Sequence, residues 1–260
     1  MRRVLTALVL IPLIAALVLW ANWWLFDAVL VLVACLCYCE YDQLASAYGF
    51  GAPGPLGYAA GLLVLFTGRN LWPWLLLVLL ALVALAVAMR ASDLAHSLPR
   101  AALLVMGVIY VFGCWKCALL IRERGAHWLL YALLINWAGD IGAYYAGRRF
   151  GRRRLAERVS PGKTWAGTAG SLIASVIVAG AYLLRFVSDV TVIAAIVLTV
   201  AANIAGQLGD LCESAIKRGA GRKDSGRIVP GHGGILDRVD STLFVLPVIY
   251  AYLQLASPLQ

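Results

Sequence analysis

Residues 190–217 read VTVIAAIVLTVAANIAGQLGDLCESAIK, an apolar run that becomes polar along one face before it ends. The apolar part is about 20 residues long, which is enough for a helix to cross a bilayer. Its polar residues recur at alternating spacings of four and three, which places them on one helix face: Asn203, Gln207, Asp210, Ser214 and Lys217. Because a charge facing lipid is costly, the stripe predicts a bundle interior or a watery cavity. A purely structural polar cluster between helices is the alternative.

The whole chain shares this apolar character. Hydrophobic residues make up 62% and charged residues 13% of its 260 residues, with a mean hydropathy of +0.84. A soluble domain is about half apolar and about a quarter charged, so part of the solvent here must be lipid. The net charge of +9 lies in short stretches between apolar runs. That pattern fits an anionic leaflet or phosphate-bearing substrates and leaves no soluble basic domain for nucleic acid.

The apolar runs predict an all-α fold, a polytopic membrane bundle of about nine transmembrane helices, because open strands cannot satisfy their backbone in lipid. The predicted spans are residues 4–20, 23–39, 56–68, 73–89, 101–121, 127–147, 166–186, 190–210 and 234–255. We interpret residues 1–260 as a single membrane domain, with N-terminal helices in 1–100 and catalytic helices in 101–260.

Lys and Arg are distributed unevenly between the two sides of this predicted bundle. Most of them fall in the segments that lie inside if the N-terminus is cytoplasmic. The positive-inside rule therefore predicts a cytoplasmic N-terminus and, for nine spans, an external C-terminus. Residues 148–165 and 211–233 are the longest basic inside loops, and chemistry on a cytoplasmic phosphate compound is expected there.

Two further helices carry polar faces. Asn136 and Asp140 are four residues apart, with Tyr144 one turn further, although helix–helix hydrogen bonding alone would also explain that pair. Asp237, Asp240 and Ser241 open the last span. Capping of the helix dipole explains one acid at such a position, but it does not easily explain two.

The segment between Ser214 and Asp240 has the densest polar character in the chain. It combines a run of Lys and Arg with a glycine-rich turn, and acids flank both ends. Cations and backbone N–H groups bind phosphate oxygens, carboxylates bind Mg²⁺, and glycines allow close backbone approach. This combination predicts a site for a nucleotide with its metal.

The same segment resembles the signature of the phosphatidate cytidylyltransferases, also called CDP-diacylglycerol synthases. The matching positions are Ser214, Lys217, Arg218, Lys223, Asp224, Pro230, His232, Gly233, Gly234, Asp237, Arg238 and Asp240. Residues 160–167, SPGKTWAG, are similar to a second run of that family. The Gly162-Lys163-Thr164 sequence is not a P-loop, because Glu157 stands where that motif needs glycine. The specific resemblance covers roughly residues 136–245.

The resemblance implies a nucleotidyltransferase that transfers CMP from CTP to phosphatidic acid, giving CDP-diacylglycerol and pyrophosphate in phospholipid biosynthesis. It implies Mg²⁺ as cofactor, with a second cation as an option. The expected catalytic residues are Asp210, Lys217, His232 and Asp237. The expected phosphate-binding residues are Ser160, Lys163, Thr164, Ser214, Arg218, Lys223, Arg227 and Arg238. The expected metal ligands are Asp210 and Asp237, on the two helices that flank the signature loop, with Asp140 and Asp240 as further candidates.

Two other classes of function remain open at this point. One is a CTP-dependent kinase or a cytidylyltransferase that acts on another membrane lipid. The other is a transporter of an anionic metabolite, which would need polar residues through the full bilayer depth. We expect CTP, phosphatidic acid and the bilayer as partners, with a homodimer as an option. The expected location is the cell membrane, with the active site facing the cytoplasm.

Overall fold

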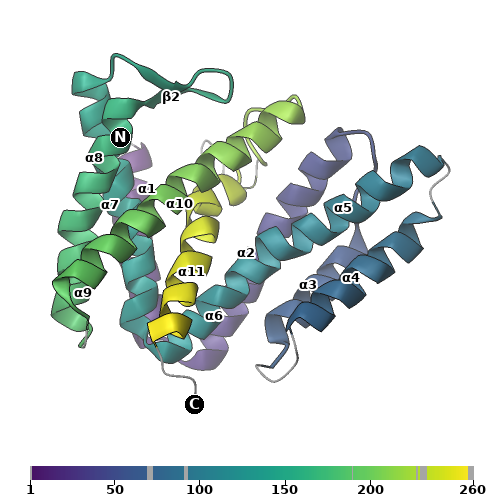
Figure 1. The fold of residues 1–260 in the computed structure, drawn as a ribbon, viewed down its shortest axis with the longest axis horizontal. Coiled ribbons are helices and arrows are strands. Elements are labelled where there is room, and N and C mark those ends of the chain that lie inside the picture. The colour runs from purple at the N-terminus through teal and green to yellow at the C-terminus, as the bar shows by residue number, and fades with distance from the viewer. Residues whose placement is uncertain are drawn as a thin grey trace. The chain divides into compact units, whose positions relative to one another are not determined.

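The computed structural model describes residues 2–68, 73–90, 93–188, 190–226, 228 and 233–256. These residues form helices joined by short connections, with one small sheet (Figure 1). The helices are α1 Arg2–Trp20, α2 Trp23–Ala47, α3 Pro55–Phe66, α4 Pro73–Ala88, η1 Leu94–His96, α5 Ser97–Gly107, η2 Val108–Gly113, α6 Cys114–Arg124, α7 Ala126–Phe150, α8 Trp165–Ser175, η3 Val176–Gly180, α9 Ala181–Phe186, α10 Val192–Gly219 and α11 Leu236–Ala256.

Five helical segments of the described chain are long and apolar enough to cross a bilayer. They are Trp23–Ala47, Leu94–Arg124, Trp165–Phe186, Val192–Gly219 and Leu236–Ala256. The two π-helical turns η2 and η3 lie inside the second and third of these segments. Three shorter apolar helices accompany them: Leu10–Trp20, Pro55–Phe66 and Leu75–Ala88. The predicted helical, multi-pass membrane protein is therefore confirmed, while the number of nine spans stays a prediction.

Several helices extend beyond the ends predicted from hydrophobicity. The span predicted to end at residue 39 continues as α2 to Ala47. The helix with the polar stripe was predicted to continue beyond its span to about residue 217, and α10 does continue to Gly219. Part of the predicted loop 211–233 is therefore helical. An apolar run marks only the portion in lipid, whereas backbone hydrogen bonding continues into water as long as the residues favour a helix.

The predicted basic loop 148–165 contains a β-hairpin that the sequence reasoning missed. Helix α7 continues to Phe150, after which β1, Arg154–Ala156, pairs antiparallel with β2, Ser160–Thr164. Arg154 is opposite Thr164 and Ala156 is opposite Ser160. The strands are three and five residues long, too short and too charged for alternation to reveal them. The fold is thus all-α apart from this hairpin.

The chain forms two compact units. The first comprises Met1–Asp27, Cys117–Ala215 and Val239–Gln260, and the second comprises Ala28–Lys116 and Ile216–Arg238. Each unit takes residues from both sides of the predicted division at residue 100, and that division stays a prediction.

In the first unit, α7 packs along α8 with very little separation (Figure 1). A methyl group on Gly142 would lie 2.3 Å from the carbonyl oxygen of Gly170, and one on Gly170 would lie 2.3 Å from Cβ of Ala146. Small residues are what allow two helix backbones to approach this closely. This contact fixes α7, and with it the polar residues that α7 carries.

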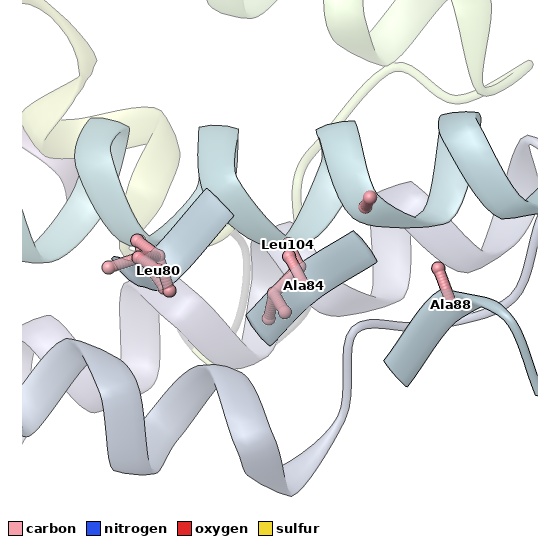
Figure 2. Packing of buried hydrophobic residues seen from close by; sticks show 6 residues of the cluster. Leu80, Ala84, Ala88 and Leu104 are labelled. Carbon is pink, nitrogen blue, oxygen red and sulfur yellow. The ribbon is translucent and has the colours of Figure 1, made fainter. Parts of the chain in front are cut away.

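In the second unit, α4 packs against α5 through aliphatic side chains. Figure 2 shows Leu80, Ala84 and Ala88 of α4 beside Leu104 of α5, and all four are buried. Helix α3 approaches aromatic rings closely, because a methyl group on Gly57 would overlap Tyr38 and one on Gly61 would overlap Phe112. These contacts build an apolar scaffold around α2.

Gly142→Ala should separate α7 from α8, because its methyl group would meet backbone atoms that cannot turn aside. We expect the free energy of unfolding to fall by about 1–3 kcal/mol, measured as a lower thermal unfolding midpoint in detergent. The matched control is Gly180→Ala, since the nearest atom to its methyl group would be Oγ1 of Thr199 at 3.8 Å. Equal midpoints for the two variants would contradict the close packing.

Candidate active site

A polar cavity of about 550 Å³ lies in the first unit, a size typical of small-ligand sites. Helices α7, α8, α10 and α11 and the hairpin contribute to its wall. The residues that line it are Asn136, Asp140, Ala143, Tyr144, Gly147, Arg148, Gly151, Arg154, Gly162, Lys163, Thr164, Gly167, Thr168, Ser171, Asn203, Gly206, Gln207, Asp210 and Ser241. Acids, cations and amides therefore share one partly open cavity.

The inner end of the cavity is fixed by a buried amide network from α10 to α8. Asn203 donates through Nδ2 to Oγ of Ser171 at 3.0 Å and to Oγ of Ser175 at 2.9 Å. Its own oxygen accepts Nε2 of Gln207 at 2.6 Å. A buried amide without such partners would cost about 1–3 kcal/mol. This part of the polar stripe is thus both structural and cavity-lining.

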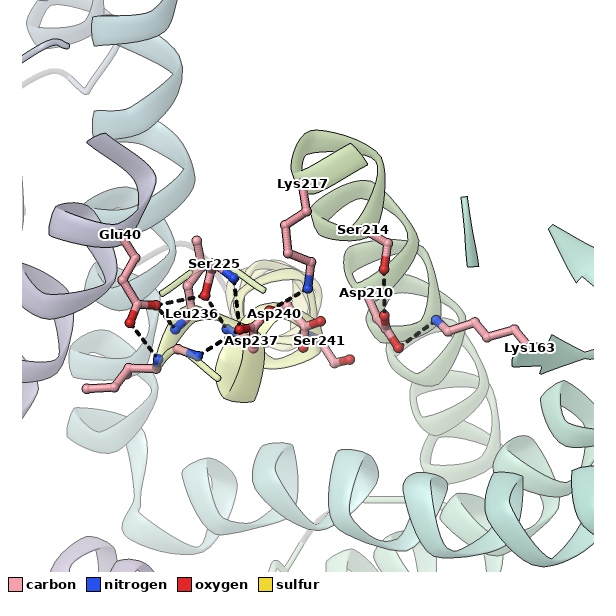
Figure 3. Close-up of polar contacts among 12 residues, drawn as sticks. Glu40, Lys163, Asp210, Ser214, Lys217, Ser225, Leu236, Asp237, Asp240 and Ser241 are labelled. Atoms are coloured by element: carbon pink, nitrogen blue, oxygen red, sulfur yellow. Dashed lines mark hydrogen bonds and ion pairs between the residues drawn. The ribbon is translucent and has the colours of Figure 1, made fainter. Parts of the chain in front are cut away.

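Asp210 is the charged centre of the α10 stripe. One of its carboxylate oxygens lies 2.6 Å from Nζ of Lys163 in β2, and the other accepts Oγ of Ser214 at 3.4 Å (Figure 3). Lys163 also donates to the carbonyl of Gln207 at 3.4 Å. The hairpin thus brings one of the predicted phosphate-binding cations directly to a predicted metal ligand.

Helix α7 supplies the opposite wall. Asn136 donates to Oγ1 of Thr242 at 3.0 Å, which ties α7 to α11. Asp140, Tyr144 and Arg148 follow at intervals of four along the same face and line the cavity. Arg148 donates to the Tyr144 hydroxyl at 3.0 Å. This face therefore offers one acid and one cation to a ligand.

A separate polar cluster occupies the start of α11 in the second unit. Lys217 forms an ion pair with Oδ1 of Asp237, while Oδ2 accepts the backbone N–H groups of Ser225 at 2.9 Å and Gly234 at 2.8 Å (Figure 3). Asp237 lies in the first helical turn, where the helix dipole favours a negative charge. It thus closes the signature segment onto the helix that follows.

Comparison with known proteins identifies the family. The model of the Cytidylyltransferase family matches residues 1–256. The chain belongs to that family. Phosphatidate cytidylyltransferases of Staphylococcus aureus (strain COL) and Staphylococcus saprophyticus are 40% and 38% identical over 198 and 196 residues, 74% of this chain and 75% of each relative. The phosphatidate cytidylyltransferase of Bacillus subtilis (strain 168) is 40% identical over 157 residues, 59% of this chain and 58% of that relative.

In this cytidylyltransferase, the predicted site residues of the first unit have different surroundings. Asp140, Lys163, Thr164 and Asp210 line the cavity, whereas Ser160 is in β2 and is not among its lining residues. Oγ1 of Thr164 accepts the Gly167 N–H at 3.1 Å and so caps α8. Asp240 is buried, and its Oδ1 accepts the N–H of Ser241 at 2.6 Å.

The signature residues of the second unit divide into a paired core and an exposed rim. Lys217 and Asp237 form the core, while Arg218, Lys223 and Arg238 are exposed. Arg227 and His232 lie outside the described residues, so their predicted roles are not tested. Asp210 belongs to the first unit and Asp237 to the second, and the metal site predicted to include both stays a prediction.

The cavity also contains cations that the sequence reasoning did not choose. Arg148 and Arg154 line it, although the sequence analysis expected phosphate chemistry in residues 148–165 without assigning a role to either arginine. The spacing of four from Asp140 through Tyr144 to Arg148 carried the signal for the first. The hairpin turns Arg154 toward the cavity, and no sequence pattern predicted the hairpin.

A second omission is Glu40 in α2. It is fully buried and contacts the segment that precedes α11. An ionisable residue at the end of an apolar span is a candidate for function or for a specific partner when it is buried. The sequence shows an acid at that position, but its burial and its partners are seen in the structure.

Proposed function

We propose that this cytidylyltransferase transfers CMP from CTP to phosphatidic acid, forming CDP-diacylglycerol and pyrophosphate. Family membership and the names of the relatives support this reaction. The structural observation that carries the proposal is the cavity of about 550 Å³ in which Asp140 and Asp210 lie with Lys163, Arg148 and Arg154. Cations for phosphates and hard oxygen ligands for a metal are what a reaction between two phosphate compounds requires.

Electrostatic neutralisation is the main task in this reaction, because both substrates are anions. Lys163, Arg148 and Arg154 are proposed to bind phosphate oxygens and so to bring the substrates together in line. An oxygen of the phosphatidic acid phosphate attacks the α-phosphorus of CTP. The bond from that phosphorus to the bridging oxygen of the β-phosphate breaks, and pyrophosphate leaves. The attacking phosphate is already ionised at neutral pH, so no general base is needed.

Mg²⁺ is the proposed cofactor, and the oxygen ligands of the cavity fit it in kind. Asp140 and Asp210 would hold the ion, which would neutralise charge on the reacting phosphate oxygens. Mg²⁺ sites commonly use one or two carboxylates and take further oxygens from substrate phosphates and water. A second cation stays a prediction.

The signature segment keeps the roles that the family resemblance implies. Asp237 and Asp240 are proposed as further metal ligands and Lys217 as a catalytic cation. The proposed phosphate-binding residues also include Ser160, Thr164, Ser214, Arg218, Lys223, Arg227 and Arg238, and His232 is proposed to donate to a phosphate oxygen. A homodimer stays a prediction.

The membrane arrangement is also part of the proposal. We propose about nine spans in the cell membrane, with the N-terminus and the active site on the cytoplasmic side. The concentration of Lys and Arg in residues 148–165 and 211–233 supports this orientation. The acyl chains would stay in the bilayer while the head group reaches the cavity.

The reaction is tested with purified protein, phosphatidic acid, Mg²⁺ and CTP labelled in either the α- or the γ-phosphate. We expect the α-label to enter lipid and the γ-label to leave as pyrophosphate. Transfer of the γ-label into lipid would identify a CTP-dependent kinase instead. The absence of any labelled lipid, in protein shown to be folded, would reject the enzymatic proposal in favour of transport.

Asp210→Asn removes the carboxylate charge that pairs with Lys163, and Asp237→Asn removes the one that pairs with Lys217. We expect each variant to lower CTP incorporation by about a hundred-fold or more, measured with α-labelled CTP on protein that elutes as a folded species. The control is Asp93→Asn, an exposed acid that caps η1 and whose cap an Asn can replace. Near-normal activity in the Asp210 and Asp237 variants would reject the metal assignment.

The orientation is tested with reporter fusions to the full chain. With a cytoplasmic N-terminus and nine spans, the C-terminus lies outside the cytoplasm. A fluorescent protein that folds only in the cytoplasm should therefore give no fluorescence when fused to the C-terminus, and a phosphatase that is active only in the periplasm should be active there. The same two reporters inserted after Glu157, which is exposed in the hairpin turn, should give the opposite result. Matching results at both positions would reject this topology.

A further inference from the structure

Glu40 is a carboxylate with no exposed surface, located in α2 just after the apolar part of that helix. It lies in α2 of the second unit, and its relative exposure is 0%. An isolated charge there would be strongly destabilising, so an acid at such a position must have specific partners. The residues it contacts therefore show what it is for.

Among the described residues, the hydrogen-bond partners of Glu40 are Ser225, Ile235 and the first residue of α11, Leu236. Its Oε1 accepts the N–H of Ile235 at 3.0 Å, and its Oε2 accepts the N–H of Leu236 at 2.8 Å. Oε2 also accepts the hydroxyl of buried Ser225 at 2.8 Å. Figure 3 shows this carboxylate facing the start of α11 from the neighbouring helix. One side chain thus holds both ends of the stretch 225–236.

Ser225 connects this contact to the Lys217–Asp237 ion pair. Its backbone N–H donates to Oδ2 of Asp237 at 2.9 Å, and its hydroxyl oxygen accepts the N–H of Asp237 at 3.3 Å. The same hydroxyl donates to Glu40. Ser225 therefore links Glu40 to Asp237 by hydrogen bonds. The signature match predicts a catalytic role for Asp237.

Two glycines of the segment have no room for a side chain because of Glu40. A methyl group on Gly226 would lie 2.4 Å from Oε1 of Glu40, and one on Gly234 would lie 2.2 Å from Oε2. The backbone of Gly226 does not have a positive φ, so its glycine is required by space and not by conformation. The segment is thus shaped around this carboxylate.

We propose that Glu40 is a positioning residue that holds the signature segment in its working conformation. This inference deepens the proposed function and rests on it. Glu40 acts through Ser225 and the first turn of α11, and so keeps Asp237 and Lys217 in place. Its charge lies at the N-terminus of α11, where the helix dipole and free N–H groups favour an anion. This role gives α2, an N-terminal helix outside the signature, a part in the proposed active site.

Glu40→Gln is a suitable test because it preserves volume while removing an acceptor. The amide offers one oxygen, and its NH₂ group would face a backbone N–H donor. At least one of the N–H groups of Ile235 and Leu236 would then lose its partner. Ser225→Ala is a milder second variant, because both backbone contacts of Glu40 remain.

The matched control is Asp42→Asn on the same helix. Asp42 accepts the N–H of Gly54 at 2.8 Å, and among the residues that the structure describes it makes no hydrogen bond to the signature segment. An Asn keeps that acceptor. The control therefore removes a carboxylate from α2 without touching residues 225–236.

Three measurements on the full-length protein in detergent test the proposal: the thermal midpoint, kcat per folded molecule, and the rate of trypsin cleavage after the exposed Arg222 and Lys223. For Glu40→Gln we expect kcat to fall and cleavage to accelerate, each by about ten-fold. The double variant Glu40→Gln/Ser225→Ala should have a kcat only slightly lower than that of Glu40→Gln alone, because both residues act through the same contact. Asp42→Asn should match the wild type. A loss of activity that only follows the unfolded fraction, or unchanged cleavage and kcat in both variants, would overturn the proposal.

The cleavage measurement separates this inference from the proposed reaction. If the wild type makes no CDP-diacylglycerol but Glu40→Gln accelerates cleavage of a folded protein, the reaction is wrong and the anchoring of the segment stands. If the wild type is active and Glu40→Gln changes neither cleavage nor kcat, the reaction stands and the positioning role is wrong.

Discussion

The ion pair between Lys217 and Asp237, whose side chains are only 11% and 12% exposed, illustrates the constraint on which this structure depends. Charge that is taken out of water must be balanced within a few ångströms. Glu40 is balanced by N–H and hydroxyl donors, and in the more open cavity Asp210 lies 2.6 Å from Nζ of Lys163. In the proposed reaction, a phosphate that takes Lys163 as its partner leaves Asp210 with a negative charge that a divalent cation can balance. Substrate binding would therefore exchange partners and leave no charge unbalanced.

The same constraint explains why the helices around the cavity, such as α7 and α8, pack with their backbones in close contact. A polar cavity inside an apolar bundle needs helices whose separation is fixed, because small shifts would break hydrogen bonds such as those of Asn203 to Ser171 and Ser175. Between α7 and α8 that separation is set by Gly142 and Gly170, where backbone meets backbone. Lipid supplies no hydrophobic force that would hold two helices together, so contact area and hydrogen bonds must do so.

The sequence predicted the parts of this structure that depend on local periodicity. The apolar runs predicted helices, and the spacings along α10 and α7 placed Asp140, Gln207 and Asp210 on faces that do line one cavity. Residues 154–164 were predicted as a loop and form a hairpin, because short charged strands have no alternation to detect. The contacts of Glu40 were beyond prediction, since its partners are nearly 200 residues away in the chain and no local pattern reports such a pairing. The end of α2 was misplaced because hydrophobicity reports the bilayer and not the helix.

The signature segment shows why an N-terminal helix has to take part in a site whose recognisable residues come later in the chain. Its glycines let the backbone approach phosphates closely, but each glycine also adds conformational freedom that must be lost on folding. The Lys217–Asp237 ion pair holds one part of it, but its exposed cations repel one another, and the proposed reaction needs them for substrate. A buried acceptor that takes several donors at once removes this freedom without using any of those cations. Glu40 satisfies that requirement, and its helix α2 is also held by the packing of Tyr38 against Phe112. In the proposed reaction, the side chains that bind two anionic substrates must be able to exchange partners. The group that keeps their backbone in place therefore has to come from another part of the chain.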